Sequence, residues 1–174
     1  MYNINNENDW ILEQKLKKYI DDYFYPARVI SILADTYLIG GAIRDLILNK
    51  KPKDLDFVVL GNNNMNWILQ VLEKFNITYR YNKFGGLKID YKGTIIDLWT
   101  TDDLFSAIQY NVDGLFFNLK SNRFISFTFN DFCENGLKLV NEENNLSNNR
   151  EVKLLKFDRE YHSRYLQSKW FLEY

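Results

Sequence analysis

The sequence predicts an α/β (α+β) fold in which a mixed β-sheet is flanked by helices. Helix-like and strand-like segments alternate along the first half of the chain, which favours strands connected through helices. Several later strand-like runs are separated only by short turns, as in hairpins, so antiparallel pairs are expected beside parallel ones. Of the 174 residues, 46% are hydrophobic and 17% are aromatic, which is enough for a sizeable core.

The first half of the chain supplies strands that alternate with helices. The segment 10–25 has the apolar periodicity of an amphipathic helix with Trp10 on its inward stripe, and Pro26 ends or bends it. An apolar strand then stops at Gly40-Gly41, where a second helix begins. The elements expected here are a helix at 10–25, a strand at 36–39, a helix at 42–48, a strand at 54–60 and a helix at 67–75.

The sequence of the second half of the chain predicts a meander of three strands, a hairpin and a terminal helix. The expected elements are strands at 78–81, 87–91 and 94–99, a short helix at 104–108, a hairpin of 113–119 with 124–129, a loop at 141–149 and a helix at 150–170. We therefore expect an N-terminal helical segment at 1–34, a principal domain at 35–140, and a linker with a C-terminal helix at 141–174.

Composition narrows the class of protein. The 22 Lys and Arg residues balance 23 Asp and Glu residues, so the whole chain carries no electrostatic footprint for nucleic acid. One cysteine excludes an internal disulfide and fits a reducing compartment, and one histidine excludes a histidine metal site. No apolar run reaches the roughly 18 residues needed to span a bilayer, and the N-terminus is too polar for a secretory signal. We expect a cytoplasmic protein without a membrane partner.

Two aspartates begin the strand expected at 54–60. Asp54 and Asp56 are two residues apart, so their side chains project from the same face of the strand. Neighbouring carboxylates repel each other unless a cation lies between them, and hard divalent ions such as Mg²⁺ prefer oxygen ligands. The alternative is that these residues are only the solvated end of a buried strand.

A third aspartate, Asp97, lies in the otherwise apolar strand 94–99. An unpaired carboxylate that faced the core would be expensive. Beside Asp56 it would complete a cluster of three carboxylates, which is able to hold two Mg²⁺ ions roughly 3.5–4 Å apart for phosphoryl transfer. The alternative is that Asp97 faces solvent on an edge strand.

Other features point to phosphate, each with a purely structural alternative. The Gly40-Gly41 turn lets a ligand approach the backbone closely, and Arg44 is placed to add a charge-assisted contact. Lys53, with the neighbouring lysines of its loop, suits a phosphate or an RNA backbone, although such a run is also typical of a solvated loop. The "NKFGG" segment at 82–86 either approaches a nucleotide or serves only as a hairpin turn.

The stretch "YLIGGAIRDLILNKKPKDLDFVV" at 37–59 resembles the nucleotidyltransferase head domain of class II poly(A) polymerases and tRNA CCA-adding enzymes. The signature of that family is a strand, Gly-Gly-x-Val-Arg-Asp, a helix, and a strand with Lys/Arg-Asp-x-Asp. Six residues of this sequence match it: Gly40, Gly41, Arg44, Asp45, Asp54 and Asp56. The stretch "FGGLKIDYKGTIIDLWT" is similar to the strand pair of the family and supplies Asp97. The likeness covers most of 35–165 and implies a polymerase-beta-like nucleotidyltransferase fold with 35–140 as the head domain and a neck-like C-terminal helix.

The resemblance implies a Mg²⁺-dependent enzyme that transfers a nucleoside monophosphate from an NTP, such as ATP, to a hydroxyl acceptor and releases pyrophosphate. The acceptor would be an RNA 3′ end (tRNA included), a small molecule or a protein. The implied metal-binding and catalytic residues are Asp54, Asp56 and Asp97, with a two-metal site. The implied nucleotide-binding residues are Gly40, Gly41, Arg44, Asp45, Lys53 and Asn118.

Two segments depart from the family pattern. In "YNVDGLFFNL" Asn118 matches, but Val112 and Asp113 stand where the family has arginines and Gly114 stands at its aspartate. The later "NREVK" lacks the Glu-Asp-x-x-Arg residues with which CCA-adding enzymes select bases. CCA addition is therefore not carried over, and a catalytically degenerate module that binds a nucleotide or a partner is the alternative. The C-terminal helix is a candidate surface for a homodimer or a partner protein.

Overall fold

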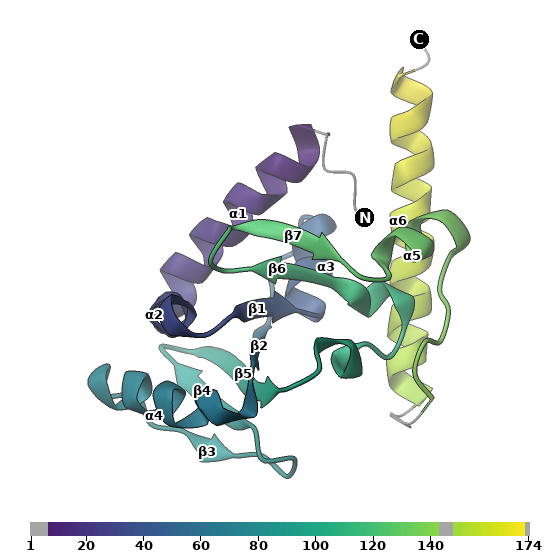
Figure 1. Cartoon of the computed structure of the whole chain (residues 1–174). Coiled ribbons are helices and arrows are strands. Elements are labelled where there is room, and N and C mark those ends of the chain that lie inside the picture. Colours follow the sequence, from purple (N-terminus) through teal and green to yellow (C-terminus); the bar gives the residue numbers. More distant parts are fainter. Residues whose placement is uncertain (1–6, 143–147, 173–174) are drawn as a thin grey trace.

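The computed structural model describes residues 7–142 and 148–172 of the chain. At its centre the described residues form a seven-stranded sheet with the order β3-β4-β5-β2-β1-β6-β7 (Figure 1). The strands are β1 (Thr36–Ile39), β2 (Asp54–Leu60), β3 (Arg80–Tyr81), β4 (Leu87–Tyr91), β5 (Thr94–Thr101), β6 (Leu115–Asn118) and β7 (Arg123–Ser126). The helices are α1 (Glu7–Phe24), α2 (Pro26–Leu33), α3 (Gly41–Ile47), α4 (Met65–Lys74), α5 (Phe129–Asn135) and α6 (Asn148–Leu172).

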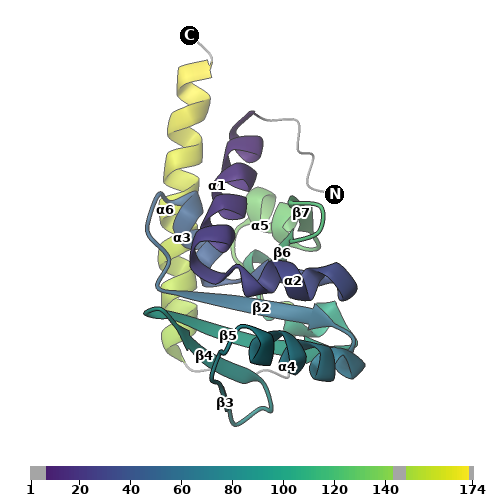
Figure 2. The ribbon, with the colours of Figure 1, turned by 90° about the vertical axis from the view of Figure 1, so that its left-hand side faces the viewer.

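The sheet mixes parallel and antiparallel pairs, as the sequence predicts. Strands β2 and β5 run parallel, whereas β1 pairs with β2 and β6 in the antiparallel sense. The pairs β3–β4, β4–β5 and β6–β7 are also antiparallel. Figure 2 shows β2, β5 and β4 side by side, with β2 at the centre of the layer. The parallel pair therefore places the starts of β2 and β5 at one edge.

Alternation along β2 separates the core from the polar face of the sheet. Leu55, Phe57 and Val59 are fully buried in the main hydrophobic core. The residues between them point to the opposite face, because side chains alternate along a strand. On that face Asp56 is followed by Val58, which belongs to a smaller hydrophobic cluster with Ile39. Carboxylates and apolar side chains therefore share this second face, and the carboxylates stand at the start of the strand.

Helices cover the main core. Buried residues of α1, α2 and α4 pack against the sheet in a single cluster, and the Phe24 ring lies 5.7 Å from the Phe57 ring of β2. The fully buried members from these helices are Leu16, Ile20, Phe24, Ala27, Ile30, Ile68 and Leu72. Figure 1 shows α1 and α2 on one side of the molecule and α6 upright on the other.

Among the described residues no helix combines the length and the apolar character that crossing a membrane requires.

The first helix, α1, ends at Phe24 just before Pro26, as the sequence predicts, and Pro26 begins the separate helix α2. A proline in the first helical turn gives up an N–H that has no partner there anyway. Two other helical features differ from the sequence expectation. The prediction that Trp10 faces inward is wrong, since the side chain is 60% exposed on α1. The sequence also predicted no helix at α5, whose Phe129 and Phe132 are buried. Residues 143–147 of the expected loop lie outside the described residues.

Helix α6 is fixed to α5. The buried Phe157 ring stacks on Phe132 with ring centroids 5.8 Å apart, and Leu154 is buried one turn earlier. Nε2 of His162 lies 3.2 Å from the carbonyl oxygen of Cys133 at the end of α5. These contacts, at residues 154–162, hold the first half of α6 against α5.

Candidate active site

The register of β2 and β5 brings the predicted aspartates together. Asp56 lies directly beside Asp97 in the parallel pair, and Asp54 is two residues before Asp56 on the same face of β2. Asp54 is exposed, whereas Asp56 and Asp97 are partly buried. The three carboxylates therefore occupy one face of the sheet at the start of the two strands.

The glycine turn packs directly against this acidic face. Gly40 separates β1 from α3 and has φ +76°, a conformation that residues with a side chain rarely adopt. A Cβ on Gly40 would lie 3.2 Å from Oδ2 of Asp56. The absence of a side chain therefore allows the turn and the carboxylate to touch, and the two parts of the sequence signature meet at this point.

The Asp56 carboxyl group has a strongly perturbed pKa. Burial raises this pKa from 3.8 to about 7, and the neighbouring charges of Asp54 and Asp97 act in the same direction. Arg44 and Arg150 oppose the shift by favouring the ionised carboxylate. A group of carboxylates that repel one another in this way is stabilised by a bound cation. The chemistry of the donors thus fits a hard divalent ion.

The three carboxylates share a face of the sheet without converging on a single point. Within 7–142 and 148–172, no three His, Cys, Asp or Glu side chains already form a group that could hold a metal ion. Part of the reason lies on β4, where Nζ of Lys88 is 3.9 Å from Oδ2 of Asp97 and provides a competing positive charge. Binding a cation would require the carboxylate side chains to rotate toward one another.

A buried carboxylate joins two arginines beside the turn. Oδ1 of Asp113 lies 3.0 Å from Nη1 of Arg44 in α3 and 2.9 Å from Nη2 of Arg150 in α6. The side chain of Asp113 is only 4% exposed, and its other oxygen accepts the backbone N–H of Tyr110. Burial lowers the pKa of Arg44, and Asp113 partly offsets that effect.

Sequence reasoning missed this arrangement. It treated Asp113 as a departure from the family pattern and did not include Arg150 among the site residues. The available signal was Asp113 itself, because an acid in the apolar stretch "NVDGLFF" is expected to need a cationic partner. The sequence could not identify that partner, which comes from a helix that begins more than thirty residues later.

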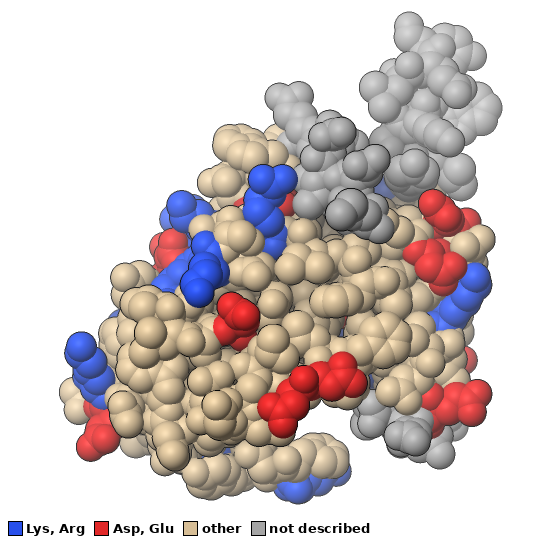
Figure 3. All heavy atoms as spheres, in the orientation of Figure 1, with Lys and Arg blue, Asp and Glu red and all other residues tan. Residues whose placement is uncertain are grey.

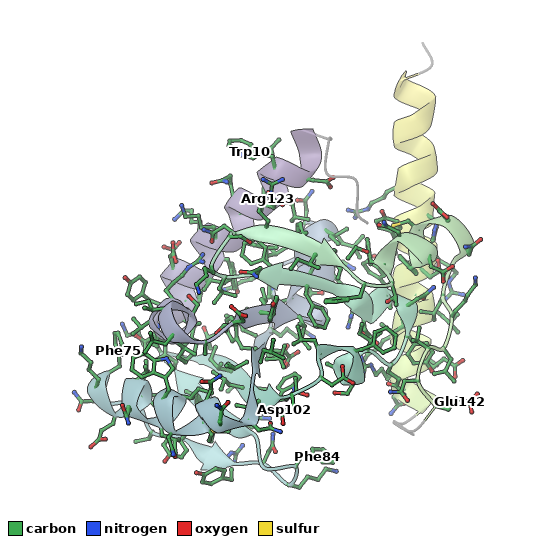
Figure 4. The ribbon with its side chains drawn as sticks, in the orientation of Figure 1. Trp10, Phe75, Phe84, Asp102, Arg123 and Glu142 are labelled. Carbon is green, nitrogen blue, oxygen red and sulfur yellow. The ribbon has the colours of Figure 1, made fainter. Side chains whose placement is uncertain are left out.

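A cleft of about 740 Å³ opens over the acidic face. Its walls include Asp56, Asp97, Trp99 and Arg150, and the β3–β4 loop contributes Phe84. Figure 3 shows the molecule hollowed above this loop, and Figure 4 places Phe84 at the loop tip below Asp102. Small-molecule sites commonly have volumes of roughly 300–1,000 Å³, so the cleft is large enough for a nucleotide.

The "NKFGG" segment forms the β3–β4 turn and also lines the cleft. Oδ1 of Asn82 accepts the backbone N–H groups of Phe84 and Gly86, which closes the turn. A Cβ on Gly86 would lie 3.1 Å from Cβ of Trp99, so this glycine lets the loop lie close to β5. Both interpretations of the segment are therefore compatible with the structure.

None of the six proposed nucleotide-binding residues is among the described residues that line the cleft, and three of them lie away from the glycine turn. Oδ1 of Asn118 accepts the backbone N–H groups of Lys120 and Ser121 in the β6–β7 turn. Lys53 is exposed just before β2, and Asp45 is partly buried on α3, where burial raises its pKa. Contacts of these side chains with a nucleotide remain predictions.

We expect the Gly40→Ala substitution to weaken both the fold and ligand binding. The added Cβ meets Oδ2 of Asp56, and a positive φ is unfavourable for alanine by roughly 1–2 kcal/mol. Urea unfolding and NTP titration measure the two effects. Gly93→Ala is the matched control, because Gly93 also has a positive φ but nothing lies within 4 Å of the point that its Cβ would occupy. Equal NTP affinity in wild type and Gly40→Ala would contradict the close approach.

Comparison with known proteins matches the segment that contains the strand, the turn and the aspartates. Residues 36–107 match the family model described as the poly A polymerase head domain. This segment is therefore similar to a nucleotidyltransferase head domain of the poly(A) polymerase type. The resemblance seen in the sequence is confirmed at that level. No curated protein sequence matches the chain.

Solved structures of CCA-adding enzymes share the fold of the head domain. The complex of a CCA-adding enzyme with CTP superposes with a TM-score of 0.53 at 21% identity, covering 72% of this chain and 35% of that one. The Thermotoga maritima CCA-adding enzyme complexed with tRNA has a TM-score of 0.50 at 21% identity, covering 78% and 33%. A tRNA-processing enzyme with CTP has a TM-score of 0.53 at 16% identity, covering 67% and 35%. The chain thus spans about a third of each, and the polymerase-beta-like nucleotidyltransferase fold is confirmed.

Proposed function

We propose that this protein is a Mg²⁺-dependent nucleotidyltransferase that moves a nucleoside monophosphate from an NTP to a hydroxyl acceptor. The observation that carries the proposal is the contact of the Gly40 turn with Asp56, which lies beside Asp97 and lines the cleft with it. In a head domain of this type, those are the places where a triphosphate and its metal ions would be bound. A nucleotide fits the volume of the cleft.

Each residue of the signature has a proposed role. Asp54, Asp56 and Asp97 would hold Mg²⁺, which when bound would neutralise charge on the phosphates and favour in-line displacement. The Gly40-Gly41 turn and Arg44 would bind the triphosphate tail. We keep Asp45, Lys53 and Asn118 as candidate nucleotide-binding residues that act from the margin of the site.

The proposed reaction replaces a phosphoanhydride bond of the NTP with a phosphoester bond to the acceptor. The acceptor oxygen forms a bond to the α-phosphorus, and the bond from that phosphorus to the β-phosphate oxygen breaks, so pyrophosphate leaves. The carboxylate of Asp97 orients the acceptor hydroxyl and takes its proton. Asp56 then has to stay ionised, and Arg44 and Arg150 favour that state by lowering its pKa.

The acceptor is proposed as a class of hydroxyl group. The choices are an RNA 3′ end (tRNA included), a small-molecule hydroxyl and a protein hydroxyl. The aromatic side chains of Trp99 and Phe84 at the cleft are suited to stacking on a base.

We further propose that the head domain spans 35–140, between an N-terminal helical segment at 1–34 and a linker with a neck-like helix at 141–174. A cytoplasmic protein whose C-terminal helix meets a second copy or a partner remains the expectation.

The test is nucleotide transfer by the purified full chain. The protein is incubated with Mg²⁺, each of four α-labelled NTPs, and either total RNA or a cell extract. We expect label to appear in one acceptor fraction and to disappear in the Asp56→Ala variant. Asp35→Ala is the control, because Asp35 is an exposed aspartate just before β1.

A binding module without turnover is the second candidate. The absence of a preformed group of three ligands among the described residues favours it. That module would bind NTP with the same affinity in wild type and Asp56→Ala, and no acceptor would become labelled.

A further inference from the structure

A buried carboxylate bridges two arginines from distant parts of the chain. A single oxygen of Asp113 contacts Arg44 at 3.0 Å and Arg150 at 2.9 Å. Two guanidinium groups share one carboxylate, so the group carries one surplus positive charge. Each guanidinium has five N–H donors, and the bond to Asp113 leaves others for a ligand. The arginine side chains are 18% and 32% exposed, so both can still be reached from solvent.

Arg150 lines the cleft together with Asp56 and Asp97, whereas Arg44 is not among the described residues that line it. Nη2 of Arg44 lies 3.9 Å from the position that a Cβ on Gly41 would take, so its guanidinium lies over the glycine turn. The two arginines thus flank the place where the glycine turn meets the carboxylates. Planar guanidinium groups bind phosphate oxygens in a bidentate manner, which a lysine cannot do.

We propose that Arg150, positioned by Asp113, binds the polyphosphate tail of the nucleotide and forms a two-arginine anion site with Arg44. The proposal rests on the proposed function, because it assigns a substrate contact within the same cleft. It makes α6 a part of the active site. The positions that lack arginine in "YNVDGLFFNL" would then be compensated by an arginine from another element.

The local structure supports a positioning role for Asp113. Its backbone belongs to a 3₁₀ turn at Asn111–Gly114, where its side chain caps the backbone N–H of Tyr110. The fully buried Asn111 fixes the same turn, since its amide donates to Asp131 and to the carbonyl oxygen of Gly136. Arg150 is held from the other side by the packing of α6 against α5. Asp113 and Arg150 are therefore already in contact before a ligand binds.

The experiment measures equilibrium binding of ATP, AMP and inorganic tripolyphosphate to the full chain. We expect Arg150→Gln to weaken ATP and tripolyphosphate binding by about tenfold or more, while AMP binding changes by less than about twofold. Arg150→Lys should recover only part of the affinity, because it restores charge without the planar fork. Arg159→Gln removes the same charge from an exposed position on α6 and should bind all three ligands as wild type does.

The Asp113→Asn variant tests whether Asp113 acts by holding the two arginines in position or only through its negative charge. The substitution makes the cleft more positive, so an account based on charge alone predicts tighter tripolyphosphate binding. We expect weaker binding, because the two arginines would repel each other and lose their common anchor. Thermal unfolding of each variant checks the fold, and if Asp113→Asn does not fold, the Arg150 series decides the matter.

The outcomes distinguish this inference from the proposed function. If Arg150→Gln binds tripolyphosphate as tightly as wild type, the inference is wrong even where wild type transfers nucleotide. If wild type transfers no nucleotide but its tripolyphosphate affinity depends on Arg150, the inference stands and the proposed enzyme does not. If wild type binds neither ATP nor tripolyphosphate, the anion site is wrong.

Discussion

The Asp56→Asn variant is expected to lose nucleotidyl transfer and at the same time to gain stability. Loss of a metal-binding carboxylate should lower the transfer rate by about a thousandfold or more. The folded state without metal, in contrast, is relieved of a crowded acid whose pKa is raised from 3.8 to about 7. Because this pKa is raised in the folded state, the carboxyl group does not lower the free energy of unfolding below pH 3.8. It lowers that free energy increasingly between pH 3.8 and 7, and by the full amount above pH 7.

The stability gain should therefore depend on pH. In EDTA at pH 8 we expect Asp56→Asn to be more stable than wild type by roughly 2–4 kcal/mol, and at pH 4 by close to nothing. Mg²⁺ should stabilise wild type at pH 8 and leave the variant unchanged. Thermal or urea unfolding measures these differences, with Asp35→Asn as the exposed control. A variant that is less stable than wild type at pH 8 and still transfers nucleotide would refute this description of the site.

The Gly114→Ala variant is expected to be among the most destabilised single substitutions in the chain. A Cβ at this position would overlap Oγ1 of Thr128 and would lie 2.8 Å from the backbone nitrogen of Thr128. Backbone cannot move aside as a flexible side chain can, so we expect a loss of about 2–4 kcal/mol in the free energy of unfolding. The neighbouring Asp113 would be displaced with it, and the arginine pair would lose its anchor.

Urea unfolding and tripolyphosphate binding check this expectation together. Gly93→Ala serves as the control without a clash, because nothing lies within 4 Å of the point that its Cβ would occupy. Its φ of +84°, which Gly114 does not share, should cost only about 1 kcal/mol. If Gly114→Ala unfolds at the urea concentration of wild type, the close packing of the two chain segments is incorrect.

The features predicted best from the sequence are those that depend on a few neighbouring residues. The strands β1, β2 and β4 have the predicted bounds, because alternation and flanking turn residues specify a strand over a few positions. Asp56 and Asp97 share one face of the sheet because the residues beside them in β2 and β5 are apolar and face the core, and this pattern can be read from the sequence.

What could not be predicted depends on contacts between distant segments. Asp113 meets Arg150 only because α6 packs on α5, and no local pattern encodes that approach. The exposure of Trp10 has a similar origin, since the start of α1 extends beyond the part of the sheet that it covers. Helix α5 was missed because its apolar residues follow directly on a strand of similar composition.

The most direct test of the central claim compares two positions of label in one NTP. Full-length protein is incubated with Mg²⁺, an acceptor preparation and the NTP labelled either at the α- or at the γ-phosphate. The proposed nucleotidyltransferase predicts that label enters the acceptor only from the α-position and that the γ-label is released as pyrophosphate in equal amount. Label that enters the acceptor from the γ-position, or bound NTP that is never consumed with any acceptor, would contradict it.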